Sequence, residues 1–297
     1  MPVETFLAKL GRGRPLLSDG AIGTMLMDRG LKAGLAPESF NLENTDALEE
    51  IARLYFEAGA DIVHTNTFGG SGLKLTAHRL GEHVEDINRN AINAVKRVAP
   101  EQGVVSMSCG PTGMILKPYG EAEPEAVYES FQQQLAIGVD AGAGAVTIET
   151  MIDIEEAKLA VKAAKSVSDS IPVMVTMTFD ETPRGFYTIM GVSIEKAAQG
   201  LEAAGVDVVG SNCGNGIEKM VEIAREFSKV TDLPILIQAN AGLPELRDGS
   251  PVYPETPDFM AEKSEELIDW GVAIIGGCCG TTPDHIRVLR QMIDSRH

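Results

Sequence analysis

The chain has 297 residues, of which 44% are hydrophobic and 23% are charged, and its formal net charge at pH 7 is −18. This composition is typical of a soluble globular protein and excludes a disordered chain, and the charge argues against a surface for nucleic acid or an anionic membrane. No apolar segment approaches the ~18 residues of a membrane span, no secretory signal is visible, and four cysteines favour a reducing compartment, so we expect a cytoplasmic protein.

Apolar runs and helical periodicity alternate along the chain. The expected strands are, in order, 16–17, 62–68, 103–108, 145–148, 172–179, 206–209, 235–238 and 272–275. The expected helices are 45–58, 84–98, 125–141, 154–167, 193–204, 217–230, 259–270 and 284–293. Continuous apolar strands are typical of parallel sheets that are buried on both faces. Eight such units predict an α/β protein with one (β/α)8 TIM barrel domain over residues 1–297, and a doubly wound sheet is the alternative.

Three cysteines follow predicted strands. Cys278 and Cys279 stand in a glycine- and threonine-rich turn after the last strand, and Cys213 stands in an Asn-Cys-Gly sequence after the sixth. Glycines let the backbone leave the pleat, and such a turn is a poor place to bury apolar volume. Three thiols at two strand ends therefore predict a zinc site with one open position. The alternatives are buried small hydrophobic side chains, or a closed structural site with four cysteine ligands that also uses Cys109.

Barrel active sites lie at the C-terminal ends of the strands. Besides the three cysteines, the polar residues expected there are Asp19, Asn66, Thr67, Cys109, Glu149, Thr178, Gln238 and Asn240. Asp19 and Glu149 are expected on opposite sides of this end, where they could hold an amino group, although both could instead be helix-capping or loop acids. We also expect Asn66, Thr67 and Asn240 to bind substrate.

Two further expectations concern groups near these strand ends. The backbone N–H groups of the turn at 66–69 are candidates for binding a carboxylate. None of the five histidines is expected to act at the site, and His64 is placed in the middle of a strand.

The predicted metal site favours one kind of chemistry. Three thiolates give a Zn²⁺ complex a net charge of −1, which makes the metal a weak Lewis acid toward water. A substrate thiol in the fourth position would lose its proton yet stay electron-rich. The expected reaction is therefore alkylation of a thiol rather than hydrolysis.

Five segments resemble motifs of the homocysteine S-methyltransferase family. They are residues 19–24, 65–69, 149–150, 212–214 and 276–282, in the order expected and spanning nearly the whole chain. The resemblance implies a (β/α)8 barrel in which Cys213, Cys278 and Cys279 bind zinc and the zinc binds the homocysteine thiol. It also implies that Asp19 and Glu149 hold the amino group of homocysteine.

The branches of this family differ in their methyl donor, which is methylcobalamin, S-methylmethionine or betaine. The chain is most similar to the homocysteine-binding module of cobalamin-dependent methionine synthase, notably across 238–242 and 252–257. Because the sequence ends at His297 without folate and corrinoid-binding domains, the expected donor is a methyl-corrinoid carried by a separate protein. The alternatives are S-methylmethionine or betaine as donor, another thiol as acceptor, or a non-catalytic zinc-binding module.

Overall fold

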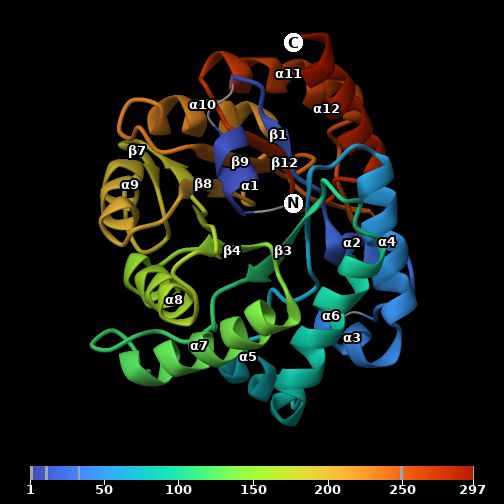
Figure 1. Cartoon of the computed structure of the whole chain (residues 1–297). Helices are drawn as coiled ribbons and strands as arrows, with labels where there is room; N and C mark the ends of the chain where they lie inside the picture. The colour runs from blue at the N-terminus through green and yellow to red at the C-terminus, as the bar shows by residue number, and fades with distance from the viewer. Residues whose placement is uncertain (1–2, 11–12, 33, 248–249, 297) are drawn as a thin grey trace.

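Eight parallel strands form a barrel at the centre of the computed structural model (Figure 1), which describes residues 3–10, 13–32, 34–247 and 250–296. The strands are β1 (Leu16–Leu17), β2 (Ile62–His64), β3 (Val104–Cys109), β4 (Ala145–Met151), β5 (Val173–Met177), β8 (Val208–Asn212), β9 (Ile235–Ala239) and β12 (Ile274–Gly277). They pair in the order β1-β12-β9-β8-β5-β4-β3-β2. A parallel bridge between Ser18 and Ile62 joins the two ends of this sheet. The predicted (β/α)8 barrel is thereby confirmed.

Helices surround the barrel (Figure 1). The eight predicted helices are α4 (Thr45–Glu57), α6 (Val84–Val98), α7 (Pro124–Ala141), α8 (Ile154–Val167), α9 (Ile194–Ala203), α10 (Ile217–Phe227), α11 (Pro257–Asp269) and α12 (Pro283–Ser295). Within the described ranges, four shorter α-helices were not predicted, because they offer too few turns for a clear period. They are α1 (Val3–Lys9), α2 (Ile22–Met27), α3 (Phe40–Glu43) and α5 (Gly72–Ala77). None of the helices in the described ranges is long and apolar enough to cross a membrane.

Two long loops at the C-terminal end of the barrel contain small antiparallel hairpins. The loop after β5 contains β6 (Asp180–Thr182) and β7 (Gly185–Tyr187), and the loop after β9 contains β10 (Glu245–Arg247) and β11 (Ser250–Val252). Both segments were expected to be irregular loops. Their strands have three residues each, so the alternating pattern that identifies a strand has no room to develop.

The second strand is shorter than predicted. It ends at His64 instead of continuing to residue 68. Beyond it, the backbone N–H of Thr67 donates to the carbonyl of Thr65 over 2.8 Å, and the Thr67 hydroxyl donates to the carbonyl of Ser108 over 2.6 Å. Threonine favours strands, but these side-chain and turn bonds replace the regular ladder. His64 is therefore the last residue of the strand, and its expected position in mid-strand, away from the site, was wrong.

The N-terminal end of the barrel is closed by apolar side chains. Helix α1 lies across this end (Figure 1). Its Phe6, together with Leu10 directly after the helix, belongs to a buried cluster with strand residues that include Ile62, Val104 and Val208. A larger apolar core fills the space between the strands and the surrounding helices. Because one end is sealed in this way, only the C-terminal end can admit a ligand.

Replacing Phe6 with alanine is expected to lower the free energy of unfolding by about 3–5 kcal/mol, because it leaves a cavity at the closed end. Phe6 is 1% exposed, whereas Leu7 on the same helix is 36% exposed and provides the matched control. Urea unfolding followed by circular dichroism would measure both variants. An equal, small loss for Phe6→Ala and Leu7→Ala would contradict the sealing role of Phe6.

Candidate functional site

A cavity of about 420 Å³ opens at the C-terminal end of the barrel. The strands and the turns that follow them contribute its polar lining, which includes Asp19, His64, Glu149, Cys213, Cys278 and Cys279. These residues come from segments that are up to 260 positions apart in the sequence, from Asp19 to Cys279. The predicted convergence of polar residues at this end is therefore present in the structure.

Three cysteine sulfur atoms lie together at the cavity. The Sγ atoms of Cys213, Cys278 and Cys279 are all within 4.8 Å of one another, and those of Cys213 and Cys279 are 3.8 Å apart. The backbone leaves the pleat at Cys213, where φ is 61°, and continues into Gly214 with φ of 75°. A positive φ at a residue other than glycine is strained by about 1–3 kcal/mol and is frequent at functional sites. This turn directs the Cys213 thiol toward the other two.

The three thiols influence one another's ionisation. Hydrogen bonds from Cys278 and then from Cys279 lower the pKa of Cys213 to about 3. The same contact with Cys213 raises the pKa of Cys278, and it raises the pKa of Cys279 to about 11. The cluster by itself therefore favours a single thiolate that the two neighbouring thiols stabilise. A divalent cation between the sulfurs would replace these protons and allow all three to ionise.

Asn212 connects the cysteine cluster to Glu149. Its Nδ2 donates to Oε2 of Glu149 over 3.1 Å and to the Thr150 hydroxyl over 2.8 Å. Its Oδ1 accepts from the backbone N–H of Thr150 over 2.8 Å. Thr150 has φ of 58°, which is rare for a β-branched residue, and it lies where the register of β4 shifts after Ile148. Asn212 thus holds the irregular strand end that presents Glu149 to the cavity, a role that the sequence analysis missed.

Glu149 is also held by Ser108, whose hydroxyl donates to Oε1. Burial raises the pKa of the Glu149 carboxyl, and the positive charge of His64 opposes this rise. Each carboxylate oxygen can accept about two hydrogen bonds, so both oxygens keep an unused lone pair. Glu149 can therefore accept hydrogen bonds from a ligand in the cavity.

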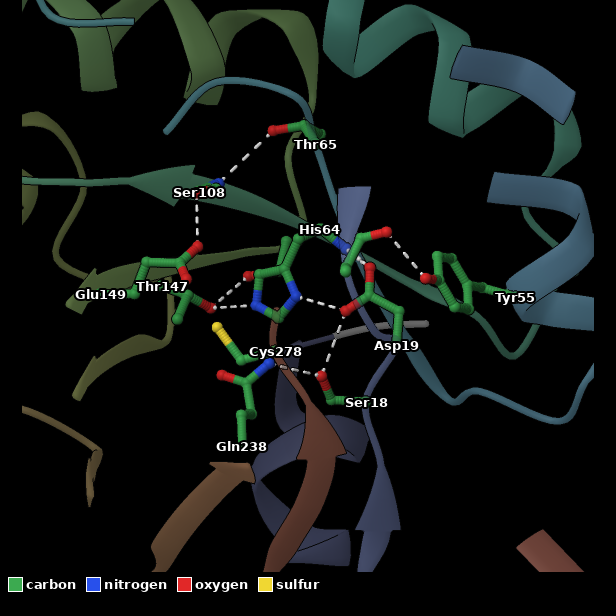
Figure 2. Close-up of polar contacts among 12 residues, drawn as sticks. Ser18, Asp19, Tyr55, His64, Thr65, Ser108, Thr147, Glu149, Gln238 and Cys278 are labelled. Atoms are coloured by element: carbon green, nitrogen blue, oxygen red, sulfur yellow. Dashed lines mark hydrogen bonds and ion pairs between the residues drawn. The ribbon is translucent and has the colours of Figure 1, made fainter. Parts of the chain in front are cut away.

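His64 and Asp19 form a buried ion pair (Figure 2). The imidazole Nδ1 lies 2.6 Å from Oδ1 of Asp19, and the two side chains are 6% and 1% exposed. On the other side of the ring, Nε2 lies 2.9 Å from the Thr147 hydroxyl. Burial lowers the pKa of His64, but the charge and hydrogen bond of Asp19, together with the charge of Glu149, raise it to about 9. No local sequence pattern signals this pair, because Asp19 follows β1 and His64 ends β2, 45 positions further along the chain.

Two other predicted substrate-binding residues are engaged with the protein. Asn66 lines the cavity, and its Nδ2 donates to the carbonyl of Pro37 over 2.8 Å and to Oδ1 of Asn41 over 2.7 Å. Thr67 is fully buried and donates to the carbonyl of Ser108. Within the turn at 66–69, the backbone N–H groups of Thr67 and Gly69 are already used by Thr65 and Glu38. This leaves fewer donors for a carboxylate than expected.

Asn240, Gln238 and Thr178 lie close to the cysteines or the cavity. The side chain of Asn240 hydrogen-bonds to Cys213, and its Oδ1 has no hydrogen-bond partner within the described part of the chain. Gln238 lines the cavity and donates from Nε2 to the Ser18 hydroxyl over 3.0 Å. The Thr178 hydroxyl donates to the carbonyl of Asn212 over 2.9 Å. Thr178 therefore supports the strand end next to Cys213.

Cys109 lies outside the three-cysteine cluster. Its side chain is fully buried in the core, and its Sγ donates to Oε1 of Gln134 on α7 over 3.4 Å. Burial raises the pKa of its thiol well above the usual value. These surroundings suit a neutral buried thiol rather than a metal ligand, which argues against the alternative of a closed site with four cysteine ligands.

Replacing His64 with glutamine is expected to remove a pH-dependent part of the stability. The pKa of His64 is raised from 6.5 to about 9. The contribution of protonated His64 to the free energy of unfolding is therefore fully present below about pH 6.5 and is lost as the pH rises through 9. Relative to His64→Gln, the wild type should therefore lose up to about 3 kcal/mol of unfolding free energy between pH 6.5 and 10. Urea titrations across this range would measure the difference. The exposed His78→Gln variant should follow the wild type, and parallel profiles for all three proteins would refute the prediction.

Comparison with known proteins identifies the family. A model of the homocysteine S-methyltransferase family matches residues 16–293. Methionine synthases from Mycobacterium leprae and Mycobacterium tuberculosis are 36% and 35% identical over 309 residues, which cover 98% of this chain and 25% of each of those proteins. The chain thus spans about a quarter of the length of these relatives.

Solved structures share the fold. The homocysteine methyltransferase MmuM from Escherichia coli, in its metallated form, has a TM-score of 0.80 at 20% identity over 96% of this chain and 98% of that one. Its oxidized form has a TM-score of 0.78 at 19% identity over the full length of both chains. Taken with the family match and the methionine synthase relatives, these findings mean that the chain belongs to the homocysteine S-methyltransferase family, a family of methyl-transferring enzymes.

Proposed function

We propose that this chain is a zinc-dependent methyltransferase that moves a methyl group to the thiol of L-homocysteine and so forms methionine. The observation that carries the proposal is the three-cysteine cluster, which lies in the same cavity as Glu149 and the Asp19–His64 pair. One cavity large enough for a ligand thus contains a cysteine cluster, whose bound cation would hold a thiol, and acidic side chains that would hold an ammonium group. The family match and the methionine synthase relatives support homocysteine as the acceptor.

The cysteine cluster fits a zinc ion. A tetrahedral zinc with Zn–S bonds of ~2.3 Å separates neighbouring sulfurs by about 3.8 Å. The Sγ atoms of Cys213 and Cys279 are 3.8 Å apart, and all three sulfurs lie within 4.8 Å. Cys213, Cys278 and Cys279 would hold the ion and leave one position facing the cavity. Bound zinc would supply the positive charge that keeps a substrate thiol deprotonated at neutral pH.

The protein side chains would position homocysteine for attack. Glu149, next to Asp19 and His64, offers charge-assisted hydrogen bonds to the ammonium group. With the thiol at the cysteine cluster and the ammonium at Glu149, the acceptor is held at two points. Binding at two points fixes the position and direction of the acceptor's sulfur, so that it can attack the methyl group of the donor in line. The sealed N-terminal end leaves the donor one direction of approach.

We propose a methyl-corrinoid as the donor, presented at the open end of the barrel by a separate protein. Large apolar side chains are exposed on loops that follow the strands at this end: Ile115 and Tyr119 after β3, Ile189 after β7, and Leu243 and Leu246 after β9. Exposed apolar groups around a site are typical of a surface that another protein covers. The similarity to methionine synthases supports this donor over S-methylmethionine or betaine.

The reduced protein is expected to bind one zinc ion per chain. Cys278→Ser should lower the zinc affinity by at least about 100-fold, because removing a ligand costs more than the 10–100-fold loss for an outer-sphere partner. Cys109→Ser is the matched control and should bind zinc as the wild type does, since Cys109 lies outside the cluster. Competition with a chromogenic chelator would measure all three affinities. Equal affinities for Cys278→Ser and the wild type would refute the site.

Single-turnover transfer from free methylcobalamin to homocysteine tests the proposed reaction. The methyl–cobalt bond breaks as the carbon–sulfur bond of methionine forms, so the cob(III)alamin absorbance should fall as methionine accumulates, and Cys278→Ala should abolish both changes. Transfer only from S-methylmethionine or betaine would overturn the corrinoid donor. Binding of zinc and homocysteine without transfer from any of the three donors would indicate a non-catalytic zinc-binding module. Transfer to another thiol but not to homocysteine would overturn the acceptor.

A further inference from the structure

The two acidic residues of the cavity are not equivalent. His64 engages both oxygens of Asp19: its Nδ1 lies 2.6 Å from Oδ1, and its backbone N–H donates to Oδ2 over 2.7 Å. The Ser18 hydroxyl adds a third contact to Oδ1 at 3.2 Å. Asp19 is 1% exposed, whereas the Glu149 side chain is only partly buried. Most of the capacity of Asp19 to accept hydrogen bonds is therefore already used inside the protein.

The ring of His64 is fixed from both sides (Figure 2). Nε2 lies 2.9 Å from the Thr147 hydroxyl, which in turn lies 2.7 Å from the Ser106 hydroxyl. A rotation that released Asp19 would break both ring contacts and leave buried polar groups unpaired, which is costly. Asp19 and His64 thus behave as one unit, and this unit has no net charge while the imidazole is protonated.

Glu149 has a different environment. Its two oxygens accept from neutral donors, the Ser108 hydroxyl and the Asn212 amide, so its charge is not cancelled by a direct partner. With both carboxylates ionised and the imidazole protonated, the three side chains Asp19, His64 and Glu149 carry one net negative charge. One ammonium group matches this charge.

We propose that His64 determines how the acceptor is recognised: by occupying Asp19 it makes Glu149 the carboxylate that contacts the acceptor's ammonium group, and Asp19 becomes a positioning residue. This inference rests on the proposed function, because it concerns the same acceptor. It departs from the equal roles that the family resemblance implies for Asp19 and Glu149. The chain should accordingly select thiols that carry an ammonium group, and this selection should depend on Glu149.

Binding of two thiols to the zinc-loaded protein tests the proposal. The probes are homocysteine and 4-mercaptobutanoic acid, which lacks the amino group, and calorimetry gives the dissociation constant of each. The wild type should prefer homocysteine by at least about tenfold, the scale of one charge-assisted hydrogen bond. Glu149→Gln should still bind 4-mercaptobutanoic acid, and the ratio of the two dissociation constants should fall to within about threefold of one.

Asp19→Asn is the matched comparison. The amide can donate to a neutral imidazole and accept from the backbone N–H of His64, so the net charge of the three residues stays the same. The preference for homocysteine should remain within about threefold of the wild type. A loss of preference in Asp19→Asn equal to that in Glu149→Gln would overturn the proposal, as would a preference that survives in Glu149→Gln.

A second arm tests His64 itself. In the Glu149→Gln background, His64→Ala removes the ring that covers Asp19, so the freed carboxylate should restore the preference for homocysteine by at least about threefold. A purely structural role of His64 would produce no such recovery, and its absence would overturn the role of His64. His64→Val serves if the alanine variant does not fold, and binding of zinc and 4-mercaptobutanoic acid checks the folding of each variant.

The outcomes separate this inference from the proposed function. If neither thiol binds the zinc-loaded wild type, the proposed function fails. If the wild type binds both thiols equally well, the proposed activation of a thiol at the cysteine cluster survives, whereas recognition of the ammonium group by Glu149 and the role of His64 are overturned.

Discussion

The structure depends on compensating the charges of the buried and partly buried side chains at the C-terminal end of the barrel. A buried carboxylate or imidazolium is costly unless an opposite charge or several hydrogen bonds compensate it. The charges of Asp19 and His64 compensate each other in an ion pair, and hydrogen bonds link the three cysteine thiols. Glu149 has only neutral donors as direct partners. The charges of the site therefore compensate one another except at Glu149 and at the sulfur cluster. A charged ligand group would gain the most binding free energy at these two places.

Backbone strain is concentrated around the same site. Thr150 and Cys213 both have positive φ angles. Thr150 is the second-last residue of β4, and Cys213 directly follows β8. Asn212, the last residue of β8, bonds to Thr150 and immediately precedes Cys213. One side chain thus links both strained positions. Such strain persists only where the surrounding contacts fix it, so this region is expected to be rigid before any ligand binds.

The two ends of the barrel have opposite roles. Apolar side chains from α1 seal the N-terminal end, which contributes to stability. The C-terminal end has the polar cavity and the loops with two hairpins and exposed apolar side chains. This division is the one that barrel enzymes share, because loops can vary while the strands hold the catalytic groups in place. In the proposed function, a small acceptor enters this cavity while a large donor approaches from outside.

The sequence by itself determined the repeated strand-helix alternation, most helix boundaries and the three cysteines of the cluster. Their signals are local: helical periods as in α6 and α8, and cysteines in glycine-rich turns after apolar runs. Only the tertiary structure decided that β2 ends at His64, that His64 occupies Asp19, and that Asn212 holds Thr150. The contacts of His64 with Asp19 and of Asn212 with Thr150 join segments that are far apart in the sequence, and the end of β2 involves the bond from Thr67 to Ser108 on β3. They depend on strand register and side-chain direction across a closed barrel, which no local pattern encodes.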